Sequence, residues 1–123
     1  MEFVQGEELF DFIGSNPQLP ENISRHIFRQ IVSAVDYCHN SCISHRGNLK
    51  KYLDVFILIF KLDLKPENIL IDKDLHVTML DFGLSTFFQP DDGLHSICGS
   101  PSYVAPEIIL GSSYSGILVD IWR

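Results

Sequence analysis

The stretch that decides the fold is His45-Arg46 together with Asp63-Leu64-Lys65-Pro66-Glu67-Asn68. If the sixteen residues Gly47 to Leu62 are removed, the two parts read as one uninterrupted H-R-D-L-K-P-E-N. Asp81-Phe82-Gly83 and Ala105-Pro106-Glu107 follow in chain order. The octet is far more specific than either triplet, and an ordered set of all three indicates common origin rather than coincidence.

These segments resemble the catalytic loop, the metal-binding triplet and the end of the activation segment of eukaryotic serine/threonine protein kinases. The resemblance implies an α+β, protein kinase-like fold, represented here by an incomplete, mostly helical large lobe. It also implies that the γ-phosphoryl group of ATP is transferred to a serine or threonine hydroxyl of a protein, with Mg²⁺ as the metal. Residues 98 to 103, read with Lys65-Pro66-Glu67, favour these acceptors over tyrosine and further resemble the calcium/calmodulin-dependent and AMP-activated branch.

The same resemblance assigns roles to the residues around the catalytic loop. Asp63 would orient the acceptor hydroxyl and accept its proton, and Lys65 would support the migrating phosphate. Asn68 and Asp81 would hold Mg²⁺, and both offer the oxygen ligands that this ion prefers. Asp72 and Asp74 are nearby carboxylates, but their spacing is typical of an exposed turn.

The first ten residues resemble the hinge and the first helix of the kinase large lobe. By this resemblance, the backbone of Glu2 and Val4 would bind adenine, and Glu8 would reach the ribose or a basic substrate side chain. Ordinary acidic residues at the start of a helix are the alternative interpretation. Glu8 and Glu67 together predict a protein substrate with Arg or Lys before the acceptor, and Ser100 is assigned to the substrate side of the site.

Further residues are predicted to regulate or support the site. We hypothesise that an upstream kinase phosphorylates Ser96 and that the phosphate pairs with Arg46, since a phosphate beside a guanidinium can order a loop. The alternative is a plain loop serine. Asp120 resembles a buried aspartate that holds the backbone around His45 and Arg46, and the alternative is an exposed, frayed residue. His45 and Glu107 are assigned structural roles.

A zinc site is a rival interpretation of one cluster in the sequence. Cys38, His39, Cys42 and His45 lie close together, and all are good zinc ligands. Cys38, however, belongs to an apolar stripe, and Tyr37-Cys38-His39 matches the end of the corresponding kinase helix. We therefore favour a helix end over a metal site.

Composition narrows the class of partner. The net charge of −7 repels phosphate backbones and anionic membrane surfaces, so neither nucleic acid nor a membrane is expected as a partner. The longest apolar run, residues 55 to 60, is far shorter than the ~20 residues that cross a bilayer. Three unevenly spaced cysteines predict a reducing, intracellular and cytoplasmic setting. A chain of 123 residues predicts one core.

Periodicity predicts the main elements. A short helix is expected over residues 7 to 13, with Gly14 as its stop, and a long helix from Pro20 onward. Its apolar residues recur at spacings of three and four, which predicts one buried stripe: Ile27, Phe28, Ile31, Val32, Val35 and Cys38. Residues 69 to 71 and 76 to 80 flank Asp72-Lys73-Asp74 and predict a hairpin, whereas residues 84 to 104 read as a mobile loop.

Residues 47 to 62 have no counterpart in the kinase family at this point. They can be encoded almost wholly with A and T, and possible codons at both seams give an opening GTAAT and a closing TTAG. We therefore hypothesise a translated, unspliced intron; a genuine surface insertion is the alternative. Sixteen extra residues between Arg46 and Asp63 predict an inactive form, because small misplacements at such a site are costly. Their run of six consecutive apolar residues predicts poor solubility.

The chain would accordingly be a partial kinase domain over residues 1–123, from the hinge to the start of the central large-lobe helix, with the small lobe preceding Met1. Two rivals to a protein kinase are kept. One is a non-catalytic, kinase-derived interaction fragment. The other is a small-molecule phosphotransferase of related architecture, against which Lys65-Pro66-Glu67 and Ala105-Pro106-Glu107 argue.

Overall fold

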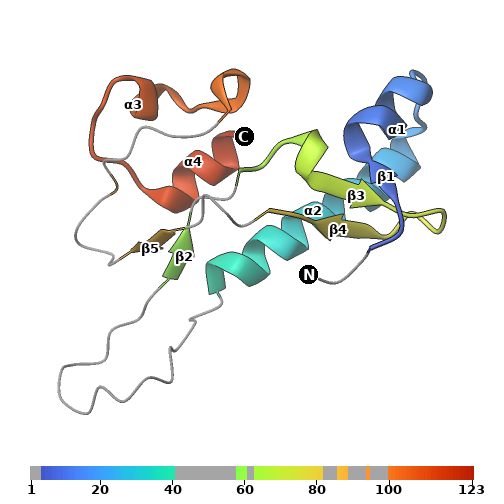
Figure 1. Ribbon diagram of the computed structural model, residues 1–123, viewed down its shortest axis with the longest axis horizontal. Coiled ribbons are helices and arrows are strands. Elements are labelled where there is room, and N and C mark those ends of the chain that lie inside the picture. The colour runs from blue at the N-terminus through green and yellow to red at the C-terminus, as the bar shows by residue number, and fades with distance from the viewer. Residues whose placement is uncertain (1–3, 41–57, 61–62, 82–85, 89–93, 95–99) are drawn as a thin grey trace, which may run out of the picture.

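The computed structural model describes residues 4–40, 58–60, 63–81, 86–88, 94 and 100–123. In these residues a three-stranded antiparallel sheet runs in the order β1 (Glu7–Glu8), β3 (Ile69–Ile71) and β4 (Val77–Met79), and β2 (Leu58–Phe60) pairs with β5 (Thr86–Phe88). The helices are α1 (Leu9–Ser15), α2 (Glu21–Asn40), α3 (Pro106–Ile109) and α4 (Gly116–Trp122), with 3₁₀ turns η1 (Pro66–Asn68) and η2 (Pro101–Tyr103). In Figure 1, α1 and the β1–β3–β4 sheet gather at one end, and α3 and α4 lie at the other.

The long helix α2 begins where the sequence predicts. The carbonyl oxygen of Pro20 accepts hydrogen bonds from the amides of Ile23 and Ser24, both at 3.0 Å, so the proline carbonyl begins the helical hydrogen bonding. At the other end, Nδ2 of Asn40 donates to the carbonyl oxygen of Asp36 at 2.9 Å. The predicted helix is thus confirmed, and the structure describes it as far as Asn40, directly after Tyr37-Cys38-His39.

The predicted buried stripe of α2 is only partly correct. Ile27 is buried, and Ile31, Val35 and Cys38 are half-buried, but Phe28 and Val32 are exposed. The reason is that α2 packs on β4 along the Ile27 side. On the other side, Phe28 and Val32 line a cavity of about 630 Å³ that α4 borders with Ile117 and Ile121.

The first helix starts later than predicted because the chain first joins the sheet. Glu7 and Glu8 pair with Ile71 and Leu70, and Glu8 has extended dihedral angles (φ −64°, ψ 137°). Gly14 does not stop the helix, which ends one residue after it, at Ser15. Its end is instead held by Asn16, whose Nδ2 donates to the carbonyl oxygen of Phe12 at 2.8 Å.

The predicted hairpin is confirmed, and its strands are β3 and β4. Ile69 pairs with Met79 and Ile71 with Val77, while both isoleucines point into the core. The segment before β1 lies very close to this hairpin. A Cβ atom at Gly6 would lie 2.8 Å from the carbonyl oxygen of Ile71, so only glycine fits there without a shift.

The prediction of a single core is wrong for the described residues, which form two apolar clusters. One joins α1, α2 and the hairpin through Leu9, Ile27, Ile69 and Ile71. The other holds Leu94, Ala105, Ile108, Tyr114 and Val119. The C-terminal elements bury these side chains among themselves because Leu94 pairs with Tyr114 through two backbone hydrogen bonds of 2.9 and 3.0 Å.

The region 84 to 104, predicted to lack regular structure, contains β5 and η2. The partner of β5 is β2, which lies inside the anomalous segment 47–62. Local periodicity does not reveal β5, because its hydrogen-bonding partner comes from a distant part of the chain. Among the helices that the structure describes, none is long and apolar enough to cross a membrane.

Candidate active site

Asp63 is the centre of the candidate site. It lies three residues before Pro66, the first residue of the turn η1, and only 8% of its surface is exposed. Nζ of Lys65 lies 3.1 Å from Oδ2 of Asp63. The hydroxyl of Ser100 lies 3.4 and 3.3 Å from the two carboxylate oxygens, and Nζ of Lys65 donates to this hydroxyl at 3.2 Å. A carboxylate, an ammonium group and a hydroxyl therefore converge on one point.

The charges of this cluster support one another. Burial alone would raise the pKa of Asp63, but the hydrogen bond and charge of Lys65, the Ser100 amide and the charge of Arg123 together lower it. The hydrogen bond to Asp63 raises the pKa of Lys65; desolvation opposes this, and the charges of Asp63, Glu67 and Asp81 add to it. Asp63 is accordingly a carboxylate and Lys65 an ammonium ion at neutral pH.

Asn68 connects this cluster to the hairpin. Its Nδ2 donates to the carbonyl oxygen of Asp63 at 2.9 Å and lies 3.5 Å from Oδ2 of the same residue. Its own carbonyl oxygen accepts a hydrogen bond from the amide of Leu80 at 2.8 Å, next to Asp81. Because the amide nitrogen of its side chain faces Asp63, Oδ1 is the atom that a cation would use.

Asp81 follows β4 in an unusual backbone conformation. Its φ of 58° is left-handed, which is uncommon for a residue other than glycine but tolerated by aspartate. Asp81 is exposed, and its charge acts on Lys65. Asn68 and Asp81 thus lie at the same end of the hairpin and offer an amide and a carboxylate oxygen, a donor set that fits Mg²⁺.

The other predicted site residues are distributed as follows. Glu2, His45, Arg46 and Ser96 lie outside the described residues. Val4 is half-buried before β1, and Glu8 is exposed within it. Glu67 in η1 and Glu107 in α3 are both half-buried.

Asp120 is buried, with 4% of its surface exposed, so the alternative of a frayed residue is wrong. Its Oδ2 lies 3.0 Å from Nε2 of His39, at the end of α2. This contact also weakens the zinc interpretation, because a proposed ligand faces a carboxylate from another helix. Burial, and then the charge of Asp120, raise the pKa of the Cys38 thiol, which disfavours the thiolate that zinc needs. Cys42 and His45 lie outside the described residues.

Gln30 supports the hairpin, and the sequence interpretation missed it. Its Nε2 donates to the carbonyl oxygen of Leu75 at 2.8 Å, and its Oε1 accepts from the amide of Val77 at 3.1 Å. The available signal was a polar residue directly beside Ile31 on the apolar stripe. Its amide completes the hydrogen bonding of two backbone groups at the turn.

Comparison with known proteins identifies the family. The family model described as "Protein kinase domain" matches residues 1–123. The chain belongs to the protein kinase family. It is also similar to CBL-interacting serine/threonine-protein kinase 16 of Arabidopsis thaliana, with 39% identity over 132 aligned positions that cover 99% of this chain and 25% of that relative.

This kinase chain therefore spans about a quarter of the length of that relative. The predicted serine/threonine kinase family and the incomplete α+β kinase-like fold are confirmed. The family typically uses ATP and Mg²⁺ and acts on proteins. The finer placement in the calcium/calmodulin-dependent and AMP-activated branch stays a prediction.

Proposed function

We propose that this chain is the catalytic part of a kinase that transfers the γ-phosphoryl group of ATP to serine or threonine hydroxyls of proteins. The observation that carries the proposal is the position of the Ser100 hydroxyl between Asp63 and Lys65. It supports the idea that these two groups can hold an alcohol at once. Asp63 would accept the proton of the acceptor hydroxyl, and Lys65 would balance the charge of the phosphoryl group.

Asn68 and Asp81 are the residues proposed to hold magnesium. When bound, the ion would neutralise charge on the phosphates of ATP. The backbone of Glu2 and Val4 is proposed to bind the adenine base, and Glu8 to reach the ribose or a basic substrate side chain. The pairing of Glu8 with Leu70, in the strand that directly follows Asn68, supports this arrangement.

Glu67 supports a preference for basic substrates. Its Oε2 is buried and has no hydrogen-bond partner among the residues that the structure describes. A buried carboxylate oxygen without a partner is costly, and a guanidinium or ammonium group from a substrate would satisfy it. We propose that Arg or Lys precedes the acceptor, and we expect Glu67→Gln to raise the KM of a basic peptide much more than that of a neutral one.

The proposal is tested in a chimera, because the chain covers a quarter of its relative. The matching segment of the Arabidopsis kinase is replaced by residues 1–123 without residues 47–62, and transfer of phosphate from labelled ATP to a basic peptide is measured. We expect Mg²⁺-dependent activity, which Asp63→Asn lowers by about 10²–10⁴-fold. A folded chimera without activity, or one that Asp63→Asn leaves unchanged, would contradict the proposal.

A non-catalytic interaction fragment is the second candidate. The separation of Arg46 from Asp63 by sixteen residues favours it for the chain as written. We propose that residues 47–62 come from an unspliced intron, and sequencing of the messenger RNA across codons 44 to 65 tests this. A spliced message would support the kinase, whereas a mature message that keeps these codons would support the fragment.

Regulation and location are proposed from the sequence alone. We propose that an upstream kinase phosphorylates Ser96 and that Arg46 binds the phosphate. In the active chimera, Ser96→Ala should abolish activation by such a kinase, and unchanged activation would end this idea. The odd number of cysteines supports a cytoplasmic location, which imaging of a fluorescent fusion would test. The negative net charge supports a protein without a nucleic-acid partner.

A further inference from the structure

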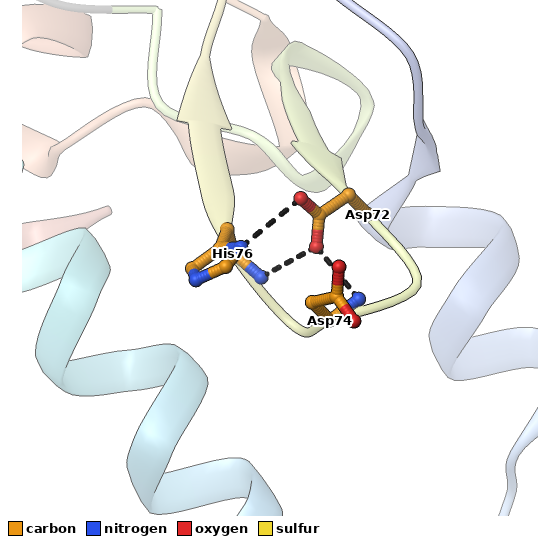
Figure 2. Close-up of side chains that lie close together, drawn as sticks. All are labelled: Asp72, Asp74 and His76. Carbon is orange, nitrogen blue, oxygen red and sulfur yellow. Dashed lines mark hydrogen bonds and ion pairs between the residues drawn. The ribbon is translucent and has the colours of Figure 1, made fainter.

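The turn between β3 and β4 brings together three metal-ligating side chains, at the end of the hairpin opposite Asn68 and Asp81. Asp72, Asp74 and His76 each offer one donor atom, and these atoms all lie within 4.8 Å of one another (Figure 2). Oδ2 of Asp72 lies 3.1 Å from Nδ1 of His76. A tetrahedral zinc ion with bonds of about 2.0 Å separates its ligand atoms by about 3.3 Å, so this pair already spans one edge of such a site.

The turn is held in shape by Gln30 and by its own backbone hydrogen bonds. Gln30 of α2 binds the backbone of Leu75 and of Val77, the two neighbours of His76. The amide of Leu75 donates to the carbonyl oxygen of Asp72 at 3.0 Å, and the amide of Asp72 donates to the carbonyl oxygen of His76 at 3.1 Å. An ion would therefore bind a formed loop, and little backbone ordering would be needed on binding.

We propose that Asp72, Asp74 and His76 form a zinc site, with water completing the coordination. One imidazole and two carboxylates suit zinc, whereas magnesium prefers oxygen ligands alone. The two carboxylates balance the charge of the ion. Asp74 and His76 are exposed, so their side chains can turn toward the ion without repacking the core.

The site would act on the hairpin as a whole. It joins Asp72, directly after β3, to Asp74 in the turn and to His76, directly before β4, and Asn68 and Asp81 lie beyond the other ends of these two strands. An ion that binds only the folded turn stabilises the folded chain. The inference does not depend on phosphoryl transfer, since no residue of the cluster belongs to the proposed active site.

The test is a calorimetric titration of the purified 123-residue chain with zinc chloride. The thiols of Cys38, Cys42 and Cys98 are first alkylated so that thiolates do not compete for the ion. We expect one zinc ion per chain, and we expect His76→Gln and Asp74→Asn each to weaken binding at least about tenfold. Asp72 is left unchanged, because its Oδ1 also accepts hydrogen bonds from the amides of Asp74 and His76.

The matched control is His26→Gln, which removes an exposed imidazole from α2 and should leave zinc binding unchanged. Circular dichroism verifies that each variant is folded, and zinc should raise the Tm of the parent and of His26→Gln alone. The proposal is overturned if the parent takes up no zinc, if His76→Gln and Asp74→Asn bind zinc as tightly as the parent, or if magnesium binds this turn equally well.

Discussion

Nε2 of His39 lies 3.0 Å from Oδ2 of Asp120, and this contact joins the end of α2 to the middle of α4. Both side chains are largely shielded from water. A hydrogen bond to a buried carboxylate is worth more than one at the surface, because the carboxylate would otherwise lose its hydration. The pair therefore fixes α4 relative to the helix that leads into the candidate site.

We expect His39→Ala to lower the free energy of unfolding by about 1.5–3 kcal/mol, the usual range for hydrogen bonds to charged groups. Urea denaturation of the full chain measures this change. His26→Ala, an exposed position on the same helix, is the control and should change stability by less than about 0.5 kcal/mol. Equal effects of the two substitutions would show that the contact contributes little.

The stability of the chain should fall in acid partly through Asp63. Its pKa is lower in the folded chain than in the unfolded chain, so its contribution is present above the ordinary aspartate value of about 4 and is lost as the pH falls through the folded value. Asp63→Asn should therefore reduce the loss of stability between pH 6 and pH 3, measured by urea denaturation. The exposed Asp36→Asn is the control, and identical pH profiles for parent and Asp63→Asn would contradict this expectation.

Two glycines should respond in opposite ways to alanine. At Gly6 the new Cβ would meet the carbonyl oxygen of Ile71 at 2.8 Å, and since this atom belongs to the backbone, we expect a loss of about 1–3 kcal/mol. At Gly14, inside α1, a Cβ meets nothing within 4 Å, so alanine should stabilise the helix by up to about 1 kcal/mol. Urea denaturation compares the two, and a destabilising Gly14→Ala would contradict the argument.

Deletion of residues 47–62 should preserve the ladder that holds β5. In the intact chain, β2 ends at Phe60, three residues before Asp63. After the deletion, Ser44 stands three residues before Asp63, so we expect residues 42 to 44 of this variant to take the place of β2 in the same register. We expect the amides of Thr86 to Phe88 to keep their pattern of protection in hydrogen exchange.

The matched control for this prediction deletes residues 47–61 and so leaves one extra residue before Asp63. A shift by one residue turns each side chain of a strand to the opposite face. The control should therefore lose protection at Thr86 to Phe88. If the amides of Thr86 to Phe88 are equally protected in the two deletion variants, the register argument is wrong.

Much of the candidate site could be predicted from residue types and spacing. Asp63, Lys65 and Asn68 lie within six residues, so their nearness follows from the chain itself, and the structure adds their hydrogen bonds. The burial of Asp120 was also expected, but its contact with His39 was not. That contact joins residues 81 positions apart, and no local pattern reports such a pair.

The errors in the predicted fold have a common physical origin. Periodicity shows which face of α2 is apolar, but not whether a neighbour covers it, so Phe28 and Val32 were wrongly expected to be buried. Likewise, Glu7 and Glu8 have the composition of a helix start, yet pairing with β3 draws them into a strand. In both cases the outcome depended on the tertiary neighbours of the segment, which local patterns do not report.

The close approach of Gly6 to Ile71 bears on the two ends of the proposed ATP site. Gly6 is two residues from Val4, whose backbone is proposed to bind adenine, and Ile71 is three residues from Asn68. The separation between base and metal then depends on how closely the backbone at Gly6 and the paired residues of β1 lie against β3. Side chains near the base could therefore change during evolution and alter which purine base is bound. The proposed magnesium ligands would keep their positions.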